Sequence, residues 1–180
     1  SLVLRPALPP GLFPRLVNMI GVGVAEGCAT ATGCAVGTKW PNDVIVQGRK
    51  VAGVLVEVQP PGIAIVGIGI NVAGGPDVLP PELRDSAGSL AVGGATAPSR
   101  EAVLAAVLNA TDRWYETLLR GDWDQIVARQ RGLETTLGQE RTVVVGDTRL
   151  TGTVRGLSPD GGLILDVAGA PRTITVGEIM

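Results

Sequence analysis

Two lysines lie close together in a chain that otherwise uses arginine for its positive charges. Lys39 and Lys50 are the only lysines among the 15 basic residues of the 180-residue chain. An ammonium is a compact point charge that can sit between a carboxylate and a phosphate, whereas a guanidinium is planar and wide. Asn42 and Asp43 lie between the lysines and add an amide and a carboxylate. The stretch 38–57 is therefore where we expect the chemistry.

Short strands are expected to position these residues. Pro41 fixes one backbone torsion, and Trp40 is biased toward an extended conformation because it precedes proline. Runs rich in branched apolar residues, separated by turns at 47–49 and 60–62, predict strands at 36–40, 43–47, 50–58 and 63–71. The last two runs are almost continuously apolar, which predicts that both faces of the sheet are covered. A mixed or antiparallel sheet with helices on at least one side fits this pattern.

The rest of the first 134 residues is expected to supply a first strand and the helices. Residues 1–5 form a strand-like run, and apolar spacing predicts helices at 12–32, 99–119 and 122–132. The long connection 73–98 is of a length that usually carries function. Gly21, Gly23 and Gly27 lie in the first helix, and we interpret them as close packing against a sheet rather than as a phosphate loop, because no strand-to-turn signature precedes them.

Composition excludes several classes of site. The chain has no histidine and two cysteines, Cys28 and Cys34, which excludes the usual zinc clusters and favours small core residues. The net charge is −2 without a basic run, so no nucleic-acid binding is expected. The apolar runs are shorter than a membrane span and no leader opens the chain, which predicts a soluble, cytoplasmic protein.

Three segments together resemble the biotin protein ligases (biotin–acetyl-CoA-carboxylase ligases). In order along the chain they are Lys39-Trp40-Pro41-Asn42-Asp43, then Lys50-x-x-Gly53-Val-Leu-Val-Glu57, then Gly67-x-Gly69-x-Asn71-Val. The resemblance implies an α+β catalytic domain of the class II aminoacyl-tRNA synthetase-like kind over 1–134, incomplete at its N-terminus. Closely spaced hairpins over 138–180 predict a small β-barrel, and the resemblance implies a Src-homology-like barrel domain over 135–180.

The resemblance also implies a two-step reaction. Biotin carboxylate attacks the α-phosphate of ATP to give biotinyl-adenylate, and a lysine of a biotin carboxyl carrier protein domain then attacks the mixed anhydride. Lys50 matches the family lysine that contacts the carboxylate and the α-phosphate; taken alone, it could be a surface lysine after a turn. Lys39 would face the phosphates or form a salt bridge. Asp43 would hold magnesium or orient and deprotonate the incoming amine.

The remaining matched residues are expected to shape the binding site. Asn42 could bind adenine or phosphate, or serve turn chemistry, and Asn71 matches an adenine-binding asparagine. Gly53, Gly67 and Gly69 would let ligands approach the backbone, or serve sheet packing. Trp40 is expected in the core, with a second role as a wall of the site.

The family's upstream arginine- and glycine-rich loop and its Ser/Thr-rich biotin segment have no match here, so we expect weak or no activity from this chain alone. One alternative is a non-catalytic module that binds nucleotide or biotinyl-adenylate, and another is a lipoate-ligase-like relative. An exposed sheet edge would allow a homodimer.

Overall fold

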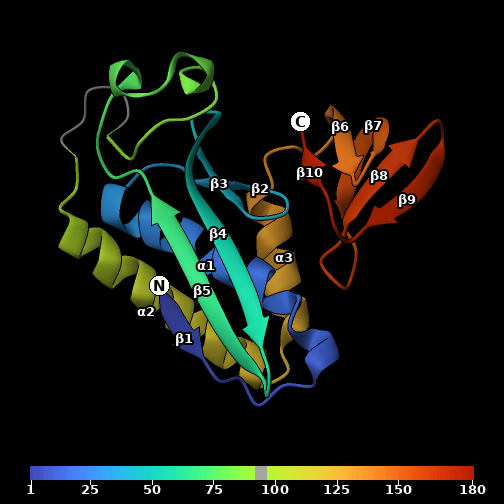
Figure 1. The fold of residues 1–180 in the computed structure, drawn as a ribbon, viewed down its shortest axis with the longest axis horizontal. Helices are drawn as coiled ribbons and strands as arrows, with labels where there is room; N and C mark the ends of the chain where they lie inside the picture. Colours follow the sequence, from blue (N-terminus) through green and yellow to red (C-terminus); the bar gives the residue numbers. More distant parts are fainter. Residues whose placement is uncertain (92–96) are drawn as a thin grey trace.

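The computed structural model describes residues 1–91 and 97–180 (Figure 1). Within these ranges the chain forms three α-helices and two five-stranded antiparallel sheets, an α+β arrangement. Figure 1 shows the two sheets as separate bodies, with the helices gathered against the first. The sequence predicted a mixed or antiparallel sheet with packed helices, and the structure has the antiparallel form.

The first sheet is built from the strands predicted around the lysines. Its order is β1-β5-β4-β3-β2, and all pairings are antiparallel. The strands are β1 (Leu2–Leu4), β2 (Gly37–Lys39), β3 (Asp43–Val46), β4 (Arg49–Gln59) and β5 (Ile63–Ile70).

Three helices cover one face of this sheet. They are α1 (Arg15–Thr32), α2 (Arg100–Leu119) and α3 (Trp123–Leu133), with short 3-10 turns η1 (Pro10–Leu12), η2 (Pro76–Val78) and η3 (Pro81–Leu83). Gly23 and Gly27 of α1 are packing residues, as expected, but their partner is α2 rather than the sheet. A Cβ added at Gly23 would lie 2.8 Å from the Thr111 Cα, and one at Gly27 would overlap the backbone of Val107.

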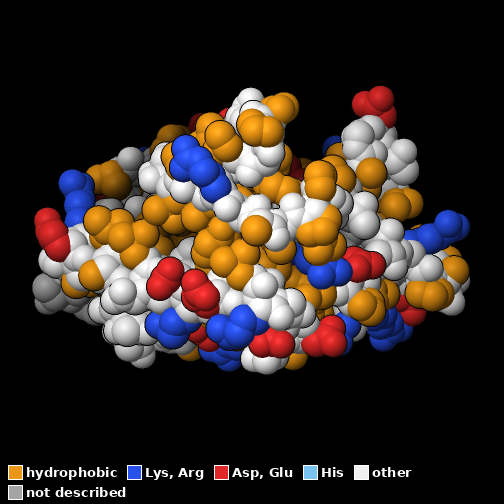
Figure 2. All heavy atoms as spheres, turned by 90° about the horizontal axis from the view of Figure 1, so that it is seen from below, with side chains coloured by type: hydrophobic (Ala, Val, Ile, Leu, Met, Phe, Trp, Pro, Cys, Tyr) orange, Lys and Arg blue, Asp and Glu red, His pale blue; other side chains and the backbone are white. Residues whose placement is uncertain are grey.

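The opposite face of the first sheet is open, so the prediction that both faces are covered is wrong. Leu55 is 60% exposed and Val3 is 55% exposed, although both lie in strands. In Figure 1 the helices lie behind β4 and β5, and nothing in the described chain lies over the front of these strands. Figure 2, which views the molecule from below, shows hydrophobic side chains exposed among charged ones. The apolar run in β4 therefore has one face buried against the helices and one face exposed.

The second sheet follows α3 and has its own core. Its order is β10-β6-β7-β8-β9. The strands are β6 (Glu140–Val145), β7 (Thr148–Leu157), β8 (Leu163–Val167), β9 (Ala170–Ile174) and β10 (Glu178–Ile179). The hairpin pattern predicted for 138–180 is confirmed, and its assignment to a particular barrel class stays a prediction.

A loop of the second sheet docks onto the first part of the chain. The Gly161 carbonyl accepts hydrogen bonds from Asn18 Nδ2 at 3.1 Å and from Trp40 Nε1 at 3.2 Å. Arg15 reaches Asp160 at 3.4 Å. These contacts come from α1 and from the segment after β2, so they fix the second sheet beside the lysine-bearing strands. Among the described helices, none is long and apolar enough to cross a membrane.

Candidate functional site

Four residues form a straight row across the open face of the first sheet. The strand registers pair Lys39 with Asp43, Asp43 with Gly53, and Gly53 with Gly69. Directly paired residues of neighbouring strands point to the same face. Two charged side chains thus stand beside two positions that carry no side chain. The row leaves room for a ligand above bare backbone next to an ammonium and a carboxylate.

A β-bulge brings Lys50 onto the same face. The β3–β4 register shifts between Val44 and Ile45, so that Val51 has no direct partner. Val51 and Ala52 are both buried, at 1% and 3% exposed. A bulge places two successive residues against one partner, which reverses the inward–outward alternation beyond it. Lys50 and Gly53 therefore share the open face although they are three positions apart.

Because Gly53 has no side chain, it leaves room for the Lys50 side chain. A Cβ at Gly53 would lie 3.3 Å from Lys50 Cε and 3.5 Å from its Nζ. The ammonium ends 2.5 Å from Asp43 Oδ1. The Lys50 side chain is 49% exposed, whereas that of Asp43 is 15% exposed. Asp43 Oδ1 is buried and makes no hydrogen bond of good geometry within the described residues, so the Lys50 charge is its compensation.

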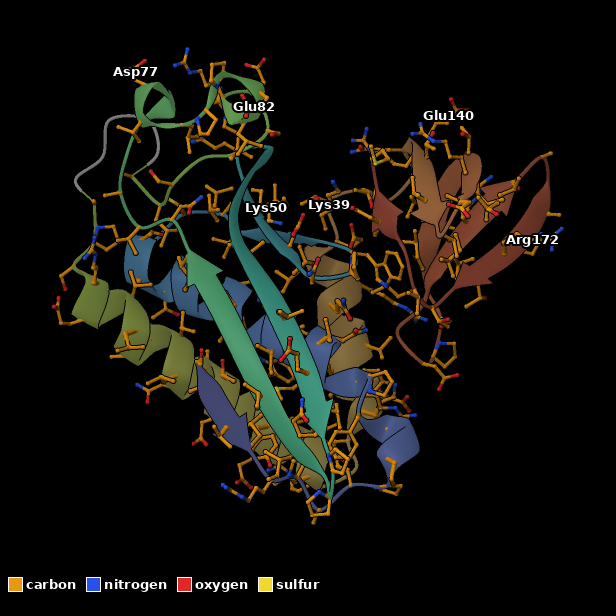
Figure 3. The ribbon with its side chains drawn as sticks, in the orientation of Figure 1. Lys39, Lys50, Asp77, Glu82, Glu140 and Arg172 are labelled. Carbon is orange, nitrogen blue, oxygen red and sulfur yellow. The ribbon has the colours of Figure 1, made fainter. Side chains whose placement is uncertain are left out.

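The lysines line a cavity of about 710 Å³, which we call the lysine cavity. Figure 3 shows Lys39 and Lys50 near one another in the region between β4 and the second sheet. Residues from both sheets and from the connection after β5 line this cavity, namely Lys39, Asp43, Ile45, Gly48, Lys50, Val51, Ala52, Gly53, Gly69, Asn71, Leu83, Ser86, Ala87, Glu178, Ile179 and Met180.

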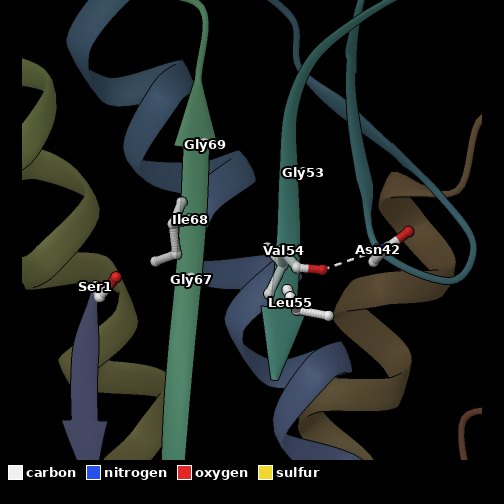
Figure 4. A pocket seen from close by; sticks show the side chains of 8 residues that line it. All are labelled: Ser1, Asn42, Gly53, Val54, Leu55, Gly67, Ile68 and Gly69. Atoms are coloured by element: carbon white, nitrogen blue, oxygen red, sulfur yellow. Dashed lines mark hydrogen bonds between the residues drawn. The ribbon is translucent and has the colours of Figure 1, made fainter. Parts of the chain in front are cut away.

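A second cavity of about 430 Å³, the glycine cavity, lies on the same sheet face. Its lining consists of Ser1, Asn42, Gly53, Val54, Leu55, Gly67, Ile68 and Gly69 (Figure 4). Gly53 and Gly69 line both cavities. The two cavities are therefore adjoining parts of one trough over the open sheet, with Lys50 at the junction and no charged side chain in the second part.

The segment after η3 forms one wall of the lysine cavity and fixes the backbone of Lys50. Lys50 N donates to the Ser86 carbonyl at 2.8 Å, and Gly88 N donates to the Lys50 carbonyl at 2.9 Å. Asn71 Nδ2 donates to the Gly88 carbonyl at 2.9 Å. Function was predicted for this long connection, but Ser86 and Ala87 were not among the predicted site residues. Their pairing with β4 is long-range and has no periodic sequence signal.

The predicted site residues separate into two groups. Lys39, Asp43, Lys50 and Asn71 line the lysine cavity, and Gly53 and Gly69 lie at the junction. Asn42 and Gly67 line the glycine cavity instead. Asn42 Nδ2 donates to the Val54 carbonyl at 2.9 Å, so its free acceptor is Oδ1.

Trp40 stands apart from both cavities. Its side chain is 2% exposed and packs with the core of the second sheet, against residues such as Leu157 and Leu163. The expected core position of Trp40 is confirmed, and its second role as a wall of the site stays a prediction. Sequence spacing could not show which core the indole would enter.

Asp43 is the carboxylate paired with Lys50, and Glu178 is a second carboxylate that lines the lysine cavity. Among the described residues there is no group of three or more acidic, cysteine or histidine side chains that could hold a metal ion. Magnesium is commonly held by one or two carboxylates together with substrate phosphates. The Asp43 carboxylate, whose side chain is 15% exposed, fits that mode.

Known proteins with the same motifs and fold identify the family. Residues 1–74 match the Biotin/lipoate A/B protein ligase family. A biotin--[acetyl-CoA-carboxylase] ligase of Paracoccus denitrificans is 31% identical over 195 residues, covering 99% of this chain and 78% of that protein. The apo structure of the biotin protein ligase from Aquifex aeolicus superposes with a TM-score of 0.87 at 29% identity, covering 99% of this chain and 79% of that one. The chain belongs to the biotin protein ligase family.

Other relatives are longer than this chain. The bifunctional ligase/repressor BirA of Bacillus subtilis (strain 168) is 29% identical over 183 residues, which cover 99% of this chain and 56% of that protein. The chain thus spans about half the length of the first curated relatives it matches. A structure of the Aquifex aeolicus ligase in complex with biotin and ATP superposes with a TM-score of 0.86.

Proposed function

We propose that the protein to which these residues belong is a biotin–[acetyl-CoA-carboxylase] ligase, and that this chain supplies one side of its active site. The observation that carries the proposal is the trough itself, in which Lys50, Lys39 and Asp43 meet over the paired glycines Gly53 and Gly69. A solved relative is described as a complex with biotin and ATP.

We infer a ligand for each of the two cavities from the charges that line them. ATP carries several negative charges and fits the lysine cavity, where Lys39 and Lys50 lie. Biotin has an uncharged ring system and a single carboxylate, and it fits the glycine cavity, which has bare backbone and Leu55 but no lysine or arginine. Lys50 at the junction then lies where the biotin carboxylate meets the α-phosphate. Asn71 lines the nucleotide end, and Asn42 and Gly67 line the biotin end.

The reaction follows from this placement. An oxygen of the biotin carboxylate attacks the α-phosphorus, and the bond to the leaving pyrophosphate breaks. Lys50 reduces the repulsion between the two anions and stabilises the charge of the transition state, while Lys39 neutralises phosphate oxygens. In the second step the amine of a carrier lysine attacks the acyl carbon, and AMP leaves.

Asp43 has three roles in this scheme. Before ligand binds, it holds the Lys50 ammonium at 2.5 Å. During transfer it orients the incoming amine and accepts its proton. Magnesium would enter as the companion of the ATP phosphates, with Asp43 as its protein ligand.

Several finer assignments belong to the same proposal. They are a class II aminoacyl-tRNA synthetase-like catalytic domain over 1–134, a Src-homology-like barrel over 135–180, a cytoplasmic location and a biotin carboxyl carrier domain as acceptor. The free edge of β1 is the surface proposed for a homodimer.

Calorimetry and a transfer assay test the proposal. We expect the 180-residue chain to bind biotinyl-adenylate, and ATP more weakly, and to transfer biotin to an apo carrier domain slowly or not at all. Binding without transfer, even after upstream residues of a ligase relative are restored, would favour a non-catalytic binding module. Absence of binding to biotinyl-adenylate, ATP and biotin, together with absence of transfer, would exclude the ligase assignment.

A further inference from the structure

Glu134 is a buried carboxylate at the junction of the two sheets. It follows α3 directly and is 7% exposed. It is the only acidic or basic residue among the buried polar residues in the described part of the chain. A buried charge costs several kcal/mol unless hydrogen bonds compensate it. A carboxylate buried in this way therefore indicates a specific role.

Both carboxylate oxygens of Glu134 are used. Oε2 accepts a hydrogen bond from the backbone N–H of Trp40 at 3.0 Å. Oε1 accepts from Thr136 N at 3.1 Å and from Thr136 Oγ1 at 2.7 Å. Burial raises the pKa of Glu134, while the Thr136 and Trp40 hydrogen bonds and the positive charge of Lys39 oppose that rise. Both carboxylate oxygens of Glu134 accept hydrogen bonds from donors. A glutamine at this position would point its NH₂ group, which is itself a donor, at one of those donors.

The contact with Trp40 reaches the candidate site through one peptide bond. Successive residues of an extended chain point in opposite directions. Trp40 sends its indole into the core of the second sheet, and Lys39 lines the lysine cavity. The neighbouring Thr38 carbonyl accepts from Thr135 N at 2.9 Å, so the segment after α3 holds β2 at two successive points.

We propose that Glu134 is a positioning residue for Lys39. By holding the Trp40 N–H, it fixes the Lys39–Trp40 peptide so that the ammonium faces the nucleotide end of the trough while the indole stays in the second sheet. The carboxylate thus couples the docking of the second sheet to the placement of a cation in the site. Only the effect of Glu134 on ATP binding rests on the proposed function.

Glu134→Gln is the direct test, with three measurements on the 180-residue chain. We expect hydrogen exchange of the Trp40 backbone amide to become about 10- to 100-fold faster, the range for a lost hydrogen bond to a charged group. Acetylation of Lys39 should speed up at least threefold relative to Lys50, the only other lysine. The Kd for ATP should rise about tenfold.

Thr117→Val provides the matched control. Thr117 is also 7% exposed, and its hydroxyl donates to the Arg113 carbonyl within α2, away from the lysine motif. It should lower stability without changing the three measurements. If Glu134→Gln does not fold, Thr136→Val removes one donor to the carboxylate and should shift the same measurements less strongly.

The outcomes separate this proposal from the proposed function. If the glutamine variant matches Thr117→Val within twofold in Trp40 exchange and Lys39 acetylation, the positioning role is overturned. If the unsubstituted chain binds no ATP, the nucleotide assignment fails, and the exchange and acetylation rates still decide the role of Glu134.

Discussion

Replacing Lys50 by methionine should separate its role in ligand binding from its role in stability. Methionine keeps most of the aliphatic stem and removes the ammonium that lies 2.5 Å from Asp43. Solvent screens the pair on the side of Lys50, which is 49% exposed, but Asp43 Oδ1 is buried and would lose the charge that compensates it. Leaving a buried polar group without a partner costs about 1–3 kcal/mol, so the free energy of unfolding should fall by about that amount. For a chain of this size, each loss of about 1 kcal/mol lowers Tm by about 2–4 °C.

The effect on ligand binding is what distinguishes Lys50 from a surface ion-pair residue. In the proposed complex, Lys50 contacts anionic oxygens within a partly enclosed trough. Hydrogen bonds to charged groups are worth about 1.5–3 kcal/mol, so the Kd for a non-hydrolysable biotinyl-adenylate analogue should rise about 10- to 100-fold. Calorimetric titration measures the Kd, and urea unfolding measures the stability.

Arg155→Met is the matched control for this comparison. Arg155 pairs with Asp166 at 2.8 Å in the second sheet, and its side chain is 58% exposed. It should lose no more stability than the Lys50 variant and keep the Kd. If the Lys50 and Arg155 variants are equal in stability and their Kd values agree within threefold, Lys50 is a surface ion-pair residue and the reasoning about the trough is refuted.

Three further predictions follow from packing and burial. Gly27→Ala should destabilise the chain by about 1–3 kcal/mol in urea unfolding, because the added Cβ would overlap the α2 backbone. Gly21→Ala is the control, because a Cβ at Gly21 would have no neighbouring atom within 4 Å, and it should stabilise the chain or leave its stability unchanged. Gly53→Val should change stability little but weaken binding of the adenylate analogue at least tenfold, since the side chain would fill the trough and displace Lys50; unchanged affinity would argue against the trough. Burial raises the pKa of the Cys28 thiol to about 12, so at pH 8 a thiol reagent should modify it only after urea unfolding, and fast modification of the native chain would contradict its buried position.

The sequence was informative wherever periodicity and motif spacing agreed. The strands around Lys39 and Lys50, their antiparallel pairing and the second group of hairpins were all predictable. The Lys50-x-x-Gly53 spacing also acquires a physical reason, because the bulge at Val51 places both residues on one face. Without the bulge, residues three apart would point to opposite faces of a strand.

The open sheet face was not predictable from the same patterns. Positions on the open face, such as Gly67 and Leu55, are occupied by residues without polar side chains. The runs in β4 and β5 therefore resemble strands that are buried on both sides. The wall formed by Ser86 and Gly88 depends on long-range backbone pairing, which leaves no local signal. Trp40 illustrates the same limit, because burial can be inferred from residue type but the particular core cannot.

Acetylation of the two lysines, with and without the non-hydrolysable biotinyl-adenylate analogue, tests most directly whether they share one ligand site. Lys39 and Lys50 are the only lysines, so mass spectrometry can follow each one separately. We predict that a saturating amount of the ligand slows acetylation of both lysines at least fivefold, with the same midpoint concentration, because both line one cavity. Rates that do not change with ligand, or that change for one lysine only, would contradict a common site for the activated acid.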